Sequence, residues 1–223
     1  MSHRKHVIAL GALLTAASIT ACGSTGASST AAQPSGSTQA SASPTAAPTP
    51  QAKLLTKTQL TAALLSLSQM PAGWSVDASG STGGDKTFCN YKQPHVAKVQ
   101  VSRNFQKGGG LTASAASVGL RQYANANDAA ASFDAMEQAL QTCHKETYQG
   151  SVLKYTAMSV DKTGDRSLGV RIESGGATVL QQFTLDGPAL INVGLGGIAD
   201  VNADTTAQLL RQQVTRYEAA ATR

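Results

Sequence analysis

The chain has 223 residues and a formal net charge of +5. It contains no run of Lys or Arg, which argues against nucleic acid as a partner. Once the N-terminal leader and a low-complexity stretch are set aside, about 170 residues remain, enough for one domain with a sizeable core.

The first 21 residues predict a secretory signal peptide. Arg4 and Lys5 give it a basic start, an apolar run follows over residues 7–14, and small residues lead to Ala21. That run is shorter than the roughly 20 residues that cross a bilayer as a helix. The next residue, Cys22, resembles the cysteine of a bacterial lipobox. The resemblance implies a lipoprotein whose first residue, Cys22, carries lipid such as palmitate and holds the protein on the extracytoplasmic face of the cell membrane. The alternative is an ordinary signal peptide cut near Ala21, which leaves a free thiol.

Residues 22–52 predict a disordered tether. Beyond Cys22 they are Ser, Thr, Ala, Gly, Gln and Pro, without one charged or aromatic side chain. Such a composition buries too little apolar surface to offset the entropy lost on ordering. As a flexible coil the segment would span about 30 Å on average. We expect it to hold a folded domain, residues 53–223, at short range from the membrane.

The first half of that domain is expected to begin with a helix. Thr56 and Gln59 have the spacing of a capping box, and apolar residues recur at helical spacing from Leu60 to Leu67. Met70 should end this helix, because the proline that follows disfavours helical geometry in the residue before it. A short extended piece near Trp74 and two strands, residues 99–105 and 116–123, are expected next.

The second half predicts a helix, four strands and a terminal helix. The earlier of these two helices is expected to open at Asn127 and Asp128 and to carry a buried stripe from Phe133 to Cys143. The strand-like runs are residues 152–160, 168–173, 178–185 and 190–195, and their short turns fit antiparallel hairpins. The last helix covers residues 204–220. This order predicts an α+β domain with helices packed against an antiparallel sheet.

Cys89 and Cys143 are the two cysteines left when Cys22 is assigned to lipid. Export brings them into an oxidising space, where a disulfide is the expected state. A bridge over this length of chain would contribute about 4 kcal/mol in the chain-entropy model. The alternative is a reactive thiol beside His144, although neighbouring residues of a helix do not face each other.

Two short motifs suggest ligand chemistry but favour simpler structures. The segment from Asp200 to Asp204 begins like a calcium-binding EF-hand loop, yet Arg211 stands where the closing glutamate belongs. We therefore expect the N-terminus of a helix. The glycines at 194, 196 and 197 follow a strand, but no strand remains after the next helix to complete a dinucleotide-binding unit. We expect a turn there.

Catalytic motifs are missing from the sequence. The expected mature chain has two histidines, His95 and His144, and neither belongs to a nucleophile elbow, a zinc-protease helix or a paired-cysteine redox motif. No residue spacing indicates a metal site. We expect a protein that is not an enzyme and that uses no cofactor and no metal.

The region from about residue 54 onward resembles the extracellular sensor domain of PknH-type actinobacterial serine/threonine kinases. The residues that carry the resemblance are the stretch 70–74 (Met-Pro-Ala-Gly-Trp), Cys89, the stretch 123–133 that enters the helix ending at Cys143, and residues 165–168 (Asp-Arg-Ser-Leu). The resemblance implies a disulfide-tied α+β domain with a cleft for an unidentified ligand. The family has a second, later cysteine pair. This sequence departs from that pattern, because no cysteine follows Cys143, and no kinase domain is present.

These observations support two functional hypotheses. In the first, the lipid-anchored sensor-like domain binds a small molecule, a lipid or a cell-wall fragment in a cleft between sheet and helices. In the second, it is a non-catalytic interaction protein that docks an envelope protein through an exposed sheet face. An enclosed cavity would favour the first and an apolar surface patch the second. The sequence does not indicate which residues bind the ligand.

Overall fold

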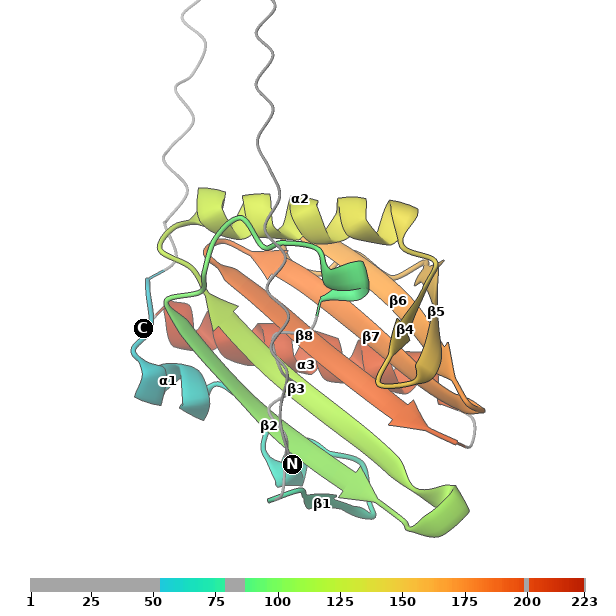
Figure 1. Cartoon of the computed structure of the whole chain (residues 1–223). Helices are drawn as coiled ribbons and strands as arrows, with labels where there is room; N and C mark the ends of the chain where they lie inside the picture. The colour runs from blue at the N-terminus through green and yellow to red at the C-terminus, as the bar shows by residue number, and fades with distance from the viewer. Residues whose placement is uncertain (1–52, 79–86, 199–200, 223) are drawn as a thin grey trace, which may run out of the picture. The chain divides into compact units, whose positions relative to one another are not determined.

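The structure is a computed structural model that describes residues 53–78, 87–198 and 201–222. Within these residues an eight-stranded, fully antiparallel sheet carries three α-helices (Figure 1). The predicted α+β class is therefore confirmed. The expected signal peptide, Cys22 and the tether lie outside the described residues.

The sheet has the strand order β1-β2-β3-β8-β7-β6-β5-β4. Its strands are β1 (Trp74–Val76), β2 (Val99–Lys107), β3 (Ser114–Gln122), β4 (Lys145–Tyr148), β5 (Ser151–Met158), β6 (Arg166–Ser174), β7 (Ala177–Asp186) and β8 (Ala189–Gly197). The four strand-like runs after the second helix are all present. The sheet thus places β3, from the first half of the domain, directly beside β8 from the second.

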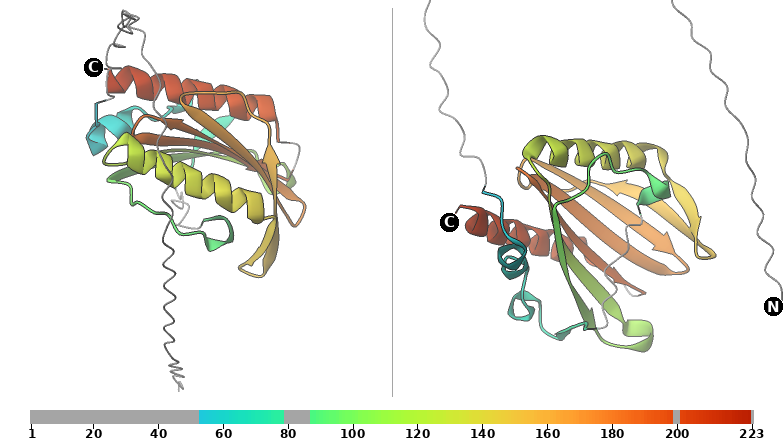
Figure 2. Two further views of the ribbon diagram at one scale, coloured as in Figure 1. Left: turned by 90° about the horizontal axis from the view of Figure 1, so that it is seen from above. Right: turned by 60° about the vertical axis from the view of Figure 1, so that its left-hand side comes forward.

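The helices are α1 (Lys57–Ala62), α2 (Ala126–Thr142) and α3 (Ala203–Ala221), with the short 3-10 turns η1 (Leu67–Gln69), η2 (Phe88–Asn90) and η3 (Gly110–Thr112). Figure 2 shows α3 and α2 on opposite faces of the sheet. Helix α1 lies with α3. Among the described residues, no helix is long and apolar enough to cross a membrane.

The first core fills the face covered by α1 and α3. Alternate residues of the central strands point into it, among them Val118 and Leu120 on β3 and Ile191 and Val193 on β8, and all four are fully buried. Because side chains alternate between the two faces of a strand, this register commits the residues between them to the opposite face.

The second core lies under α2. Phe133, Met136 and Leu140, the stripe predicted from the sequence, are buried against β5, β6, β7 and β8. Arg166 at the start of β6 also binds α2. Its guanidinium lies 4.6 Å from the ring centre of Phe133 and 2.5 Å from the carboxylate of Asp134. This packing leaves the β2–β3 end of the same face without a helix (Figure 2).

The first helix is shorter than expected. Its capping box of Thr56 and Gln59 is present, but the helix ends at Ala62 instead of reaching Met70. The carbonyl groups that would continue it are taken by α3: Gln213 and Arg216 donate to the Ala63 oxygen, and Arg216 also to that of Ala62. Leu67, predicted to face the core, is 41% exposed.

Strand β4 was not predicted. Its sequence is Lys-Glu-Thr-Tyr, and it lies at the sheet edge paired only with β5 in the described chain. Such a strand has no apolar alternation to reveal it.

Candidate functional site

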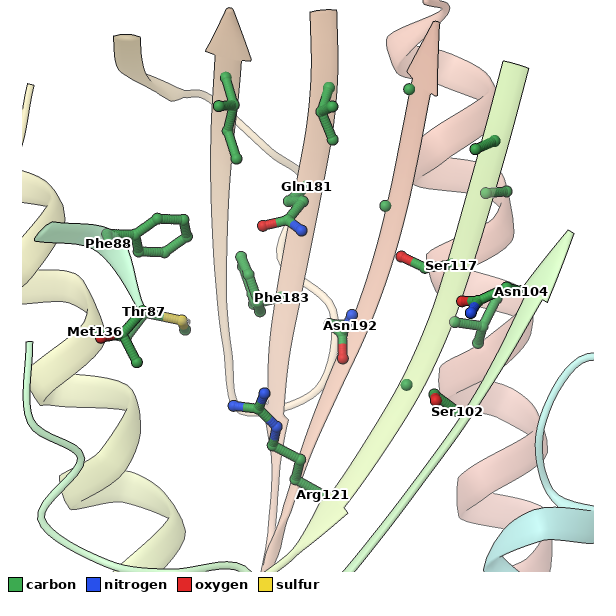
Figure 3. Close-up of a pocket in the computed structure, with 18 of the residues that line it drawn as sticks. Thr87, Phe88, Ser102, Asn104, Ser117, Arg121, Met136, Gln181, Phe183 and Asn192 are labelled. Atoms are coloured by element: carbon green, nitrogen blue, oxygen red, sulfur yellow. The ribbon is translucent and has the colours of Figure 1, made fainter. Parts of the chain in front are cut away.

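A cavity of about 750 Å3 lies on the face of the sheet that α2 covers in part (Figure 3). Strands β2, β3, β8, β7, β6 and β5 form its base, and η2 and α2 contribute to its sides. Its volume is within the range of small-molecule sites in proteins. The main lining groups divide into a polar floor and an aromatic wall.

We call six residues of β3, β8 and β7 the polar floor: Ser117, Gly119, Arg121, Gln181, Asn192 and Gly194. Along each strand they alternate with side chains that are buried on the opposite face of the sheet. The floor is therefore a direct result of strand register.

Two glycines let polar side chains lie flat on this floor. Gly119 pairs with Asn192 across β3 and β8, and a Cβ atom on Gly119 would lie 2.4 Å from the Asn192 Oδ1 atom. Gly194 pairs with Ser117 on one side and Gln181 on the other, and its Cβ would lie 2.8 Å from the Ser117 Oγ atom. Each glycine thus provides the space that a neighbouring polar group occupies.

The functional groups of the floor are not used by the fold. In the described part of the chain, no hydrogen bond joins the side chain of Ser117, Arg121, Gln181 or Asn192 to another residue. Gln122, one residue from Arg121, is different: it is 3% exposed and makes two backbone hydrogen bonds. The Gln122 side chain therefore serves the fold, whereas the side chains on the floor are available to a ligand.

Arg121 is the one cationic side chain among the described residues that line the cavity, and Asp77 is the one carboxylate. Figure 3 shows the guanidinium pointing toward the side chains of Asn192 and Phe183. Burial raises the pKa of Tyr91 to about 12, and the nearby charge of Arg121 opposes that rise. The cavity thus offers a single positive charge at a defined end.

Four rings form the aromatic wall: Phe88, Tyr91, Tyr155 and Phe183. The ring of Phe88 is central, with its centre 5.3 Å from Tyr155 and 6.2 Å from Phe183, both edge-to-face. The Tyr155 hydroxyl donates a short hydrogen bond to Glu146, and burial together with this bond raises the pKa of Tyr155. The wall offers ring surface with its hydroxyls held neutral at physiological pH.

A disulfide holds the aromatic wall in place. Cys89 and Cys143 are bonded, with 5.8 Å between their Cα atoms, as the sequence predicted. Cys89 belongs to η2 next to Phe88, and Cys143 caps the C-terminus of α2. The bridge therefore ties the segment that carries Phe88 to the helix at its side.

The two histidines considered as catalytic candidates do not line the cavity. His95 lies against Asp128, with 3.5 Å between Nδ1 and Oδ1. His144 is exposed beside the disulfide. The described residues contain no group of three or more potential metal ligands.

The motif at Asp200–Asp204 does form a helix start, as expected for the part that is described. Asn202 caps α3 by accepting a hydrogen bond from the Thr205 amide, and Asp204 lies in the first turn; Asp200 is outside the described residues. The prediction for the glycines at 194, 196 and 197 was wrong, because they belong to β8 and not to a turn. Gly194 and Gly196 instead line the cavity.

Sequence reasoning missed the polar floor altogether. Its residues come from three strands that are neighbours only in the folded sheet, and polar residues alternating with apolar ones normally mean a solvent-exposed face. One signal was present: Gly and Ser alternate with Val and Leu in both 117–120 and 193–196. Two central strands with such small outward residues leave room over the sheet.

Comparisons with known proteins identify a similar fold but assign the chain to no family. No family profile matches the sequence, and no curated protein matches it. The fold of the described domain has a counterpart among solved structures. The chain is similar to the crystal structure of the extracellular domain of PknH from Mycobacterium tuberculosis, with a TM-score of 0.52 and 12% identity over 73% of this chain and 96% of that one. The resemblance read from the sequence thus holds at the level of the fold.

Proposed function

We propose that the protein is a lipid-anchored, extracytoplasmic and non-catalytic binding domain that captures a small ligand in the cavity on its sheet. The observation that carries this proposal is the polar floor, whose side chains make no hydrogen bond to the described protein. Native proteins pair most of their buried polar groups, and here several part-buried polar side chains without a described protein partner gather in one concavity, which favours ligand recognition.

Other features agree with the proposed location and the lack of catalysis. The similar fold is that of an extracellular domain, and the disulfide suits an oxidising compartment. The described residues that line the cavity include no histidine and no cysteine thiol, so they do not form the usual pairs for nucleophilic or acid–base catalysis. Its chemistry is that of hydrogen bonding and ring contact.

The alternative, docking of an envelope protein, has weaker support. The large apolar side chains that are exposed lie on different parts of the described chain: Leu54, Leu67, Val76, Val96, Tyr148, Val152 and Ile198. Apart from the pair Tyr148 and Val152 on the β4–β5 hairpin, they come from separate elements. Interaction surfaces normally gather such residues into one patch.

Native mass spectrometry of the full chain purified from its own host tests the proposal. We expect a carried ligand mass that disappears in Ala115→Trp, which places a large ring in the cavity. Thr156→Trp is the matched control, because Thr156 is exposed and on β5 alternates with the cavity-lining Tyr155. A ligand mass that both variants retain would show binding elsewhere and contradict the proposal.

A further inference from the structure

The polar floor extends over a distance that few ligand classes match. Arg121, the Gly119–Asn192 pair and Ser117 occupy successive same-face positions of β3. Two residues of a strand advance about 6.6 Å, so the row covers roughly 13 Å from Arg121 to Ser117. Figure 3 shows Asn192 between Arg121 and Ser117, and Gln181 lies across Gly194 from Ser117. A ligand that uses this row must be polar along its whole length.

The groups in the row both donate and accept hydrogen bonds. Asn192 and Gln181 carry amides and Ser117 a hydroxyl, so each can act in either direction. Sugar hydroxyls have the same dual character. An acyl chain along the row would instead remove water from these groups without replacing its hydrogen bonds, which is costly.

The aromatic wall supplies the second element of sugar recognition. A pyranose ring exposes C–H bonds on its faces and hydroxyls around its edge. Phe88 and Phe183 present rings beside the floor, so a sugar can contact them with one face while its edge reaches Gln181 and Asn192 (Figure 3). This combination of ring surface and amides explains why one cavity has two such different sides.

The charge of the cavity narrows the ligand further. Among the described lining residues, the single cation Arg121 stands with one carboxylate, Asp77. A phosphate or polyanion carries more than one negative charge and usually meets several cations or a helix N-terminus, whereas the single charge of a carboxylate is matched by one guanidinium, which can bind it through two parallel hydrogen bonds. We propose that the cavity binds an acidic saccharide, with hydroxyls on the polar floor and a carboxylate on Arg121. This proposal rests on the proposed binding function.

Isothermal titration of the full chain tests the assignment with three probes: a trisaccharide that contains one uronic acid, its carboxyl-reduced neutral form, and a short-chain phosphatidylglycerol kept below its micelle concentration, so that the lipid anchor has no aggregate to enter. We expect the acidic trisaccharide to bind at least tenfold more tightly than the neutral one. Arg121→Gln should remove this preference, which corresponds to about a tenfold rise in Kd for the acidic form alone. Arg171→Gln is the control, since Arg171 pairs with Glu173 and does not line the cavity.

Two glycine substitutions, one in the polar floor and one outside it as a control, test whether the floor binds the saccharide. Gly119→Ala should displace the Asn192 amide and weaken both trisaccharides several-fold, because the conflict is with the end of a side chain. Gly109→Ala should leave both affinities unchanged, because its Cβ meets nothing within 4 Å. Equal affinities in all these variants would overturn the floor assignment.

The remaining outcomes separate this inference from the proposed function. Binding of phosphatidylglycerol alone, lost in Ala115→Trp, would overturn the acidic saccharide while leaving a ligand-binding cavity. If no probe binds, the acidic saccharide is likewise rejected, and the carried mass described above decides the binding function by itself. Saccharide binding that survives Ala115→Trp would reject the cavity as its site.

Discussion

The side-chain amide of Gln122 forms two hydrogen bonds with the backbone of Leu55. Its Oε1 atom accepts from the Leu55 amide and its Nε2 atom donates to the Leu55 carbonyl, both at 2.8 Å. Gln213 of α3 does the same near the other end of this segment, accepting from the Leu65 amide and donating to the Ala63 carbonyl. Two buried glutamines thereby fix the two ends of residues 55–65, the segment that contains α1: Gln122 ties one end to the sheet and Gln213 ties the other to α3.

We expect Gln122→Ala to lower the free energy of unfolding by about 2–3 kcal/mol, because it leaves a buried amide and a buried carbonyl without partners. Chemical denaturation checks this. Gln106→Ala, on the exposed part of β2, is the matched control and should change stability by less than about 0.5 kcal/mol. Equal effects of the two substitutions would mean that water replaces the Gln122 side chain.

Replacing both Cys89 and Cys143 by Ser should cost about 4 kcal/mol, because the bridge joins residues 54 positions apart and restricts the unfolded chain. Thermal unfolding of the oxidised protein and the double variant measures the loss. The variant should also bind ligand more weakly, since Phe88 is next to the freed Cys89. Alkylation of both thiols in the unreduced protein would contradict the bridge.

Asp186 should make stability depend on pH. Burial, then the carboxylates of Glu218 and Asp165, raise its pKa to about 6, against about 3.9 in an unfolded chain. The folded state therefore holds the proton more tightly, and the stability from this preference is full below about pH 4 and is lost as pH rises through 6. Asp186→Asn should be more stable than the parent at pH 7.5 by about 1 kcal/mol, a value reduced for its half-exposed position. At pH 4 the two should unfold alike; a constant difference would refute the assignment.

Cys22→Ser should release the protein from membranes into the soluble fraction, because the lipid would lose its attachment point. Fractionation of host cells with an antibody against the folded domain measures this. Membrane association that persists in the variant would contradict the anchor.

The sequence was most informative where one residue pattern matched one element. The capping box at Thr56, the buried stripe of α2 and the strands β5 to β8 were all predicted, because each depends on local spacing. The end of α1 was not, because side chains from α3, some 150 residues away, take its carbonyl groups. Contacts of that kind leave no local signal.

The site was the least predictable part for the same reason. Gly119 and Asn192 are far apart in the chain, and their relation exists only once β3 pairs with β8. Glycines at 194 and 196 suggested a turn because glycine is common in turns, whereas here the lack of a side chain serves a neighbouring strand. The alternation that predicted the strands said which residues share a face, but not that α2 would leave part of that face open.

The amide of Lys53 lies 3.4 Å from the carbonyl oxygen of Ala221, so the first and last described segments meet beside α3, on the face of the sheet opposite the cavity. For surface plasmon resonance or single-molecule work, this geometry makes either end a suitable point of immobilisation. A linker attached there would hold the domain by the face that α1 and α3 cover and leave the cavity open to ligand in the flow.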